Sequence, residues 1–348
     1  MMVTLGVDAH KKTHTIVGCD PAGAQVGAIT VAATTAGHLK AVRWAAGWEQ
    51  RRWGLEDCRH LSRRLEAELL SVGEVVVRVP PKMMAGVRRS ARTRGKSDPI
   101  DALAVARAVI REPGLPVARL DGPSREVRLL VDYREGLVRE RTGLQYRLRW
   151  RLHELDPVLD PATGSLDRYR VLDELAETLG THEGMVAELA GREITRIREL
   201  TGEINQLERE IKSRVAEVAP SLLTIPGCGA LTAAKLVGEA ADIGRFHSRN
   251  AYAMWSGTAP IPVWSGNTER FRLNRGGNRQ TNAALHRIAI TQMRIHPQAR
   301  QLITRHLSAG KTKKEALRIL KRRLSDVVYR TMINDTNQLS QAAPAMAA

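Results

Sequence analysis

The chain has 348 residues, 43% of them hydrophobic, and its 54 lysine and arginine residues outnumber 37 acidic residues to give a net charge of +17. This length is sufficient for two or three domains, each with its own core. The positive charge favours a polyanionic partner, nucleic acid first of all. The aromatic content of 4% favours contacts to phosphates over base stacking as the main mode of binding.

The sequence also argues against several other classes of protein. No run of about twenty apolar residues occurs, which argues against a membrane protein. The charged start, MMVTLGVDAHKK, does not have the pattern of a signal peptide. Cys19, Cys58 and Cys228 are too widely separated to indicate a disulfide framework or a zinc site. We therefore expect a cytoplasmic protein.

The amino-terminal segment alternates apolar and polar residues as a sheet does. Strands are predicted at residues 3–9, 13–20, 26–34, 51–58 and 74–80, and helices at 35–48 and 61–73 and from KSDPIDA onward. The first three strands form a meander, and the later ones alternate with helices. This order predicts a mixed α/β domain over residues 1–118.

Residues 119–218 have a helical period instead. Apolar residues from Val127 to Leu155 and from Ile197 to Val218 recur at threes and fours, which predicts two long helices. The Asp-Pro-rich interval 156–169 predicts a loop, so an antiparallel hairpin is expected. The apolar seam fits a dimerisation stalk and a hairpin that packs within one chain equally well.

A third segment, residues 219–305, opens with LLTIPGCGALTAAKLVGEA, which is similar to a helix-hairpin-helix. In such a motif Gly227 and Gly229 would let backbone N–H groups approach a phosphate, although both could simply be turn glycines. Residues 306–348 predict a basic helix and a flexible tail.

Two carboxylates, Asp98 and Asp101, open the helix that begins with KSDPIDA. They could complement the helix dipole beside an N-cap, or bind metal. Asp8 lies on the first strand and Glu56 near the end of the fourth, and neighbouring strands would bring these two acids to the helix start. Four converging acids suit hard divalent cations, so we favour a metal site. The basic run before it could hold a polyanionic substrate through Arg88, Arg89, Arg92, Arg94 and Lys96.

The stretches GVDAHKKTH, LEDCRH and KSDPIDA resemble the signature of insertion-sequence transposases with a RuvC-like DEDD domain, the "IS one-ten" family. This family is related to Piv-type invertases and to bridge-RNA-guided recombinases, and the resemblance covers residues 3–305. It implies an α/β RNase H-like amino-terminal domain, an α-helical coiled-coil hairpin and a mostly α carboxy-terminal transposase domain. It assigns Asp8, Glu56, Asp98 and Asp101 as catalytic ligands of Mg²⁺ or Mn²⁺, as two ions or one per site.

The stretch WSGTAPIPVWSGNTERFRLNRGGNRQTNAALH resembles the family's second signature, and it contains two Ser-Gly steps. Ser256 belongs to the WSGTAP segment, which corresponds to the family's Gly-x-x-Pro element, and Ser265 lies where the family has its nucleophile. Nearby groups that could stabilise a pentacovalent phosphate are Arg270, Arg272, Arg275 and Asn278. Asn282 and Ala283 depart from the arginine that many relatives have there.

The resemblance implies a DNA transposase that forms a covalent phosphoserine bond in a site assembled between subunits. Its implied partners are donor and target DNA, a bridge RNA that guides the enzyme, and further copies of the chain, as a dimer or as a tetramer in the synaptic complex. The implied location is the bacterial or archaeal cytoplasm, at the nucleoid when active. One alternative is a metal-dependent nuclease or junction resolvase that uses water, and another is a nucleic-acid-binding protein without catalysis.

Overall fold

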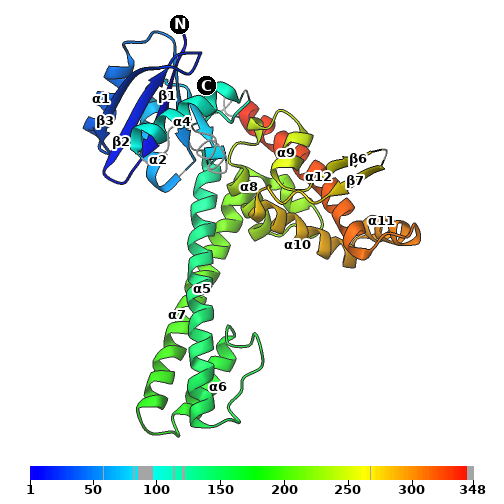
Figure 1. Cartoon of the computed structure of the whole chain (residues 1–348). Coiled ribbons are helices and arrows are strands. Elements are labelled where there is room, and N and C mark those ends of the chain that lie inside the picture. Colours follow the sequence, from blue (N-terminus) through cyan, green and yellow to red (C-terminus); the bar gives the residue numbers. More distant parts are fainter. Residues whose placement is uncertain are drawn as a thin grey trace. The chain divides into compact units, whose positions relative to one another are not determined.

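The computed structural model describes residues 1–57, 59–80, 83–84, 97–112, 114–119, 122–266 and 268–342. The chain forms two compact units, Met1–Asp121 and Gly122–Ala348. Both units are drawn in Figure 1, and each is described by itself.

The first unit is built on a five-stranded sheet in the order β3-β2-β1-β4-β5. Its strands are β1 (Val3–Ala9), β2 (Thr13–Cys19), β3 (Gln25–Ala32), β4 (Arg51–Glu56) and β5 (Val76–Val79). The first three strands pair antiparallel, whereas β4 pairs parallel with β1 and with β5. The predicted mixed α/β sheet is confirmed, because the alternating pattern and the helix-length connections specify this arrangement.

Helices cover both faces of this sheet. The helices α1 (Thr35–Ala45) and α2 (Arg59–Ser71) contribute apolar residues to the core that contains Val3, Leu5 and Val7 of β1. On the opposite face lies α4 (Asp98–Arg111), which packs against β2 and β5.

Two glycines let α4 come close to the central strands. A Cβ atom at Gly6 of β1 would lie 2.1 Å from the carbonyl oxygen of Ala102, and one at Gly54 of β4 would lie 2.6 Å from the side chain of Val109. Such separations are far below van der Waals contact, so only glycine fits at Gly6 without moving the helix. The face of β1 and β4 that carries these glycines is therefore the face on which α4 sits.

The second unit contains a long helical hairpin, visible in Figure 1 as two helices that run side by side. Its helices are α5 (Pro123–Leu155) and α7 (Met185–Val218), with the short α6 (Tyr169–Leu179) packed at their far end. The two long helices were predicted, but α6 was not. The predicted seam is buried within this one chain, since Leu200 is 0% and Leu207 is 8% exposed.

The rest of the second unit is a helical bundle with one β-hairpin. It comprises η1 (Pro220–Thr224), α8 (Ala230–Ala240), η2 (Ile243–Arg245), α9 (Arg249–Trp255), β6 (Ile261–Ser265), β7 (Thr268–Arg272), α10 (Arg279–Ile295), α11 (Pro297–Ser308) and α12 (Lys313–Ala342). One core joins these helices to Val127 of α5 and Ile211 of α7. It also includes Leu320 and Leu324 of α12, so the boundary predicted at residue 305 lies inside a continuous core.

Candidate functional site

An acidic cluster forms where β1 ends and α4 begins. Asp8 is the second-last residue of β1, and Asp98 is the first residue of α4. His10 lies between them, with its Nε2 atom 3.0 Å from Asp8 Oδ2 and 3.3 Å from Asp98 Oδ1. One ligand atom from each of these three residues lies within 4.8 Å of the others. The structure thus brings together two of the acids predicted from sequence.

Asp101 and Glu56 belong to the same end of the sheet. Asp101 lies one turn after Asp98 and is only 7% exposed. Val7 pairs with Leu55 in the parallel β1–β4 ladder, so Asp8 and Glu56 occupy equivalent positions on neighbouring strands. Because side chains alternate along a strand, Asp8 points to the same face as Gly6, which is the face covered by α4.

The electrostatics of the cluster favour a bound cation. Burial raises the pKa of the Asp8 carboxyl above its usual value, the charges of Asp101 and Asp98 raise it further, and His10 opposes the rise. Carboxylates that repel one another in a half-buried site are stabilised by a divalent ion, for which they supply hard oxygen ligands. The donor set therefore fits Mg²⁺ or Mn²⁺.

The alternative role of these acids, as a helix cap, receives little support. Ser97 is the N-cap residue of α4, but its side chain makes no capping hydrogen bond. Pro99 occupies the first turn, and Asp98 already lies inside the helix. The acids still complement the helix dipole, which is compatible with a metal site.

The structure describes the side-chain surroundings of one of the two Ser-Gly serines, Ser256. Ser256 is fully buried at the end of α9, where its hydroxyl donates to the carbonyl of Ala253 and lies 3.0 Å from Thr258 Oγ1. Ser265 ends β6 and pairs through its backbone with Thr268 of β7. Its side chain and that of Arg270 lie outside the described part of the structure. The enclosed hydroxyl of Ser256 argues against a nucleophilic role for that residue, and the role expected for Ser265 stays a prediction.

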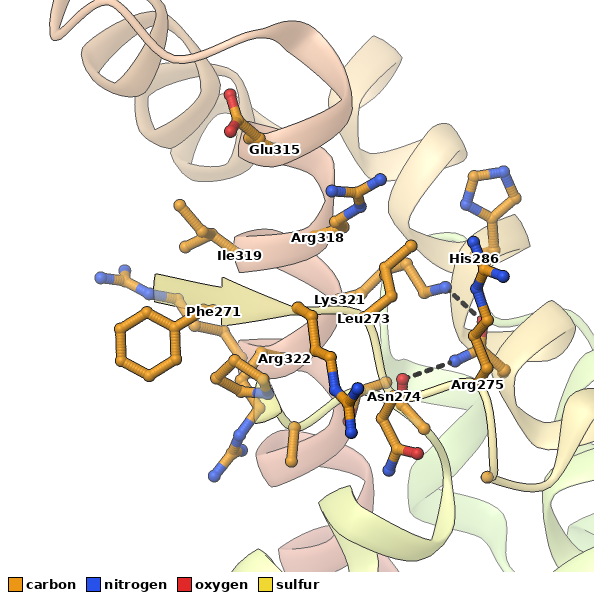
Figure 2. Close-up of a pocket in the computed structure, with 18 of the residues that line it drawn as sticks. Phe271, Leu273, Asn274, Arg275, His286, Glu315, Arg318, Ile319, Lys321 and Arg322 are labelled. Atoms are coloured by element: carbon orange, nitrogen blue, oxygen red, sulfur yellow. Dashed lines mark hydrogen bonds between the residues drawn. The ribbon is translucent and has the colours of Figure 1, made fainter. Parts of the chain in front are cut away.

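A pocket of about 1070 Å³ lies between β7, the start of α10 and the first half of α12. Figure 2 shows Phe271 and Ile319 at one end of it and His286 at the other. The lysine and arginine side chains that line it are Arg272, Arg275, Arg279, Lys311, Arg318, Lys321, Arg322 and Arg323. We call this the C-terminal basic pocket. Two arginines that the sequence predicted as phosphate contacts, Arg272 and Arg275, therefore lie beside other cations.

The helix-hairpin-helix region forms as expected, with η1 and α8 on either side of a tight turn. Gly227 has φ +82°, and a Cβ atom there would lie 2.9 Å from Thr291 Cβ, so the turn itself requires glycine. Gly229 is the N-cap residue of α8, with no atom within 4 Å of the position of a Cβ. The phosphate contact expected at Gly227 and Gly229 stays a prediction.

Asn278 has a structural role in this unit. Its side-chain oxygen accepts from the backbone N–H of Thr281 at the start of α10, and its Nδ2 donates to Glu239 at 2.8 Å. The remaining predicted nucleic-acid contacts, Arg88, Arg89, Arg92, Arg94 and Lys96, lie outside the described residues.

Comparison with known proteins identifies the family. Residues 5–157 match a family model described as a transposase, the DEDD type named for IS110, and residues 219–304 match the model described as transposase IS116/IS110/IS902 family. Together these matches cover more than half of the chain. The chain belongs to the IS110/IS116 family of transposases.

Individual relatives of this transposase come from insertion elements. An uncharacterized protein of insertion element IS116 from Streptomyces clavuligerus is 24% identical, over 98% of this chain and 97% of the relative. A protein of insertion element IS110 from Streptomyces coelicolor is 30% identical, over 54% of this chain and 42% of its own. A putative transposase of Sinorhizobium fredii is 29% identical, over 48% of this chain and 43% of the relative. The expected transposase family is thus confirmed.

Some residues of the transposase's candidate sites were not predicted. His10 stands within the first signature, but nothing in its sequence context distinguishes a histidine between two carboxylates from one on the surface. Lys321 belongs to a basic helix, and only the fold places it beside β7. The described helices include none that combines the length and apolar character of a membrane span.

Proposed function

We propose that this transposase cleaves and rejoins DNA at the acidic cluster, with Asp8, Glu56, Asp98 and Asp101 as ligands of Mg²⁺ or Mn²⁺, present as two ions or one per site. The convergence of acids from β1 and α4 around Asp8 is the observation that carries the proposal. The sheet order β3-β2-β1-β4-β5, with an antiparallel meander joined to parallel strands, supports an RNase H-like fold for this unit.

The residues of the cluster would position and neutralise a scissile phosphate. A divalent cation held there supplies charge neutralisation and activation of a phosphodiester. His10 bridges Asp8 and Asp98 at 3.0 and 3.3 Å, so its imidazole keeps the two carboxylates at the same point of the sheet edge. The glycines Gly6 and Gly54 contribute by letting α4 deliver Asp98 and Asp101 to that edge.

We propose Ser265 as the nucleophile of strand cleavage. Its Oγ would lose a proton and bond to phosphorus, while one P–O bond of the DNA backbone breaks and the departing oxygen takes up a proton. Rejoining reverses this exchange with a different DNA end, so no high-energy cofactor is consumed. The burial of Ser256 supports this choice, because a fully enclosed hydroxyl cannot reach a DNA strand.

A second candidate uses water as the nucleophile, as a nuclease or junction resolvase does. The acidic cluster favours it, because ligands from β1 and α4 come together within the first unit and require no group from the second. In that case Ser265 would have a structural role only.

Trapping cleaved DNA on the protein separates the two candidates. A substrate nicked beside the cleavage site prevents rejoining, so the Ser265 mechanism leaves protein attached to DNA after denaturation. Ser265→Ala should abolish both adduct and cleavage, whereas Ser256→Ala should retain the adduct if it folds. Asp98→Asn should abolish cleavage while DNA binding persists. Magnesium-dependent cleavage by Ser265→Ala would assign water as the nucleophile.

We also propose a bridge RNA and a homo-oligomer as partners, on the basis of the family resemblance and the strong positive charge. The RNA would come from a non-coding end of the insertion element and pair with donor and target DNA. Sequencing of RNA that copurifies with the transposase from cells carrying the element tests this. Recovery of random cellular RNA alone would contradict it.

A further inference from the structure

We propose that the C-terminal basic pocket binds an unpaired nucleotide of single-stranded DNA, with the base against Phe271 and the phosphates on the cations around it. The inference rests on the proposed function, since it concerns the DNA strand that the transposase cuts. It goes beyond general DNA affinity, because a pocket for one unpaired base discriminates a single strand from a duplex.

The pocket exposes apolar side chains that phosphate contacts do not explain. Phe271 is 62% exposed on β7, Leu273 follows it at 46%, and Ile319 faces them from α12 (Figure 2). In duplex DNA the faces of the bases are stacked on one another, so such a surface can contact them only where a strand is unpaired. An aromatic ring stacks on any base, which makes this contact tolerant of sequence.

The pocket has an excess of positive charge, which favours an anionic ligand: among the described residues, its eight lysine and arginine side chains are accompanied by one lining carboxylate, that of Glu315. Within the described residues, Arg322 is the only lysine or arginine of this lining that pairs with a carboxylate, that of Asp326. On the α5–α7 hairpin, by contrast, Arg134, Arg149 and Arg196 each have an acidic partner. Cations that outnumber the carboxylates around them repel one another and are stabilised when phosphates bind between them.

The floor of the pocket is held in place by hydrogen bonds. Lys321 donates to Asn282 Oδ1 at 2.6 Å, and the amide of Asn282 donates to the carbonyls of Ser256 and Gly257. A Cβ atom at Gly277 would lie 2.2 Å from the nitrogen of Gly257, so the two backbone segments are in direct contact. A pocket with a fixed floor loses little conformational entropy when a ligand binds.

The position of Phe271 relates this pocket to the proposed nucleophile. Ser265 pairs with Thr268, and Phe271 lies three residues further along β7, opposite Pro262. At about 3.3 Å per residue, the backbone positions of Thr268 and Phe271 are about 10 Å apart. The bound nucleotide would therefore lie on the same β-hairpin as the proposed nucleophile.

Fluorescence anisotropy with the full chain tests the proposal. Labelled oligo(dT), an equally long DNA duplex and oligo(U) are titrated in EDTA, so that cleavage cannot occur and failure of the proposed chemistry does not affect the result. Phe271→Ala should weaken oligo(dT) binding by about 5- to 100-fold, as expected for one lost stack, and leave duplex binding unchanged. Phe271→Trp should restore it. Arg318→Gln should weaken oligo(dT) binding and reduce its salt dependence.

Two matched variants control for nonspecific effects. Trp150→Ala removes an aromatic ring that is 74% exposed on α5, and Arg287→Gln removes an exposed cation of α10 outside the pocket. Both should leave oligo(dT) affinity unchanged. Unchanged affinity in Phe271→Ala, equal losses for duplex and single strand, or a loss confined to oligo(U) would each overturn the proposal. Because Phe271 is exposed, its variants should keep the wild-type melting temperature.

Discussion

At the scale of single residues, the first unit holds two histidines that are almost completely buried. The rings of His14 on β2 and His38 on α1 stack with centroids 5.1 Å apart. The Nδ1 atom of His38 lies 2.7 Å from Glu68 Oε2, whereas Nδ1 of His14 is buried without a hydrogen-bond partner among the described residues. Burial, together with the charges of His38 and His10, lowers the pKa of His14 from 6.5 to about 4.

The lowered pKa of His14 predicts acid sensitivity of this unit. Between about pH 6.5 and pH 4 the unfolded chain binds a proton at His14 that the folded chain does not, so the free energy of unfolding decreases as the pH falls through this window. The full effect is on the order of 3 kcal/mol. His14→Phe should flatten the dependence of the melting temperature on pH over this range.

The matched control is His153→Phe, which replaces an exposed histidine of α5. It should leave the wild-type pH dependence intact. An equally steep loss of stability in His14→Phe would show that other groups cause the acid sensitivity.

The acids of the candidate site could be predicted from the sequence, but the histidine between two of them could not. Asp8 interrupts an apolar strand, which is costly unless the carboxylate has a ligand, and Asp98 and Asp101 share one helical turn. These are local signals. The sequence around His10 contains no such local signal, because the position of His10 between two carboxylates depends on how closely α4 approaches the sheet.

At the scale of elements, the distance between α4 and the sheet is set by the glycines beneath the helix. The helix contributes Asp101 and Ala102 to the buried side, and its first turn lies at the end of β1 where Asp8 is. The distance between helix and sheet therefore determines the distance between the carboxylates of Asp98 and Asp8.

Gly6→Ala should disrupt this arrangement. The new methyl group would overlap the backbone of Ala102 and Ala106, at 2.1 and 2.4 Å, so α4 must shift outward. We expect a loss of about 3 kcal/mol or more in the free energy of unfolding, together with weaker Mn²⁺ binding by calorimetry. Gly191→Ala in α7 meets no atom within 4 Å and should stabilise the chain slightly. Unaltered Mn²⁺ affinity in Gly6→Ala would contradict the link between glycine and site.

The elements predicted best were those whose apolar pattern repeats regularly over many residues. The sheet strands and the helices α5 and α7 follow their apolar patterns. The helix α6 begins at the last residue of the interval expected to be a loop and occupies a stretch for which no element was predicted, because its apolar stripe of Leu172, Leu175 and Leu179 is short. The hairpin β6–β7 was missed because Gly266, with φ +58°, forms its turn within a segment considered only for catalysis.

At the scale of the whole molecule, the apolar seam between α5 and α7 is buried within a single chain. Leu148 and Leu152 of α5 and Leu200 and Ile204 of α7 belong to one core with α6, inside a single chain. A seam filled in this way is occupied within one chain, so a homo-oligomer that used the hairpin would have to contact its exposed residues, such as Tyr146 and Trp150 of α5.

Leu200→Asp together with Leu207→Asp should therefore unfold the hairpin without dissociating an assembly. Burying two carboxylates in this core costs more than about 4 kcal/mol, and the melting temperature should fall sharply. Light scattering below that temperature should report the wild-type mass. Leu129→Asp, at a position of α5 that is 52% exposed, should change neither quantity. A smaller mass at unchanged melting temperature would restore the stalk interpretation.

The same pair of helices belongs to two cores at once. Val131 of α5 and Val215 of α7 pack with the bundle that carries the C-terminal basic pocket, whereas Leu148 and Ile197 pack at the α6 end. An uninterrupted helix of 33 residues spans about 50 Å. A ligand at the α6 end that displaced these helices as rigid bodies would also displace the residues that they contribute to the distant bundle. By thermodynamic reciprocity, DNA bound in the basic pocket would change the affinity for that ligand by the same factor.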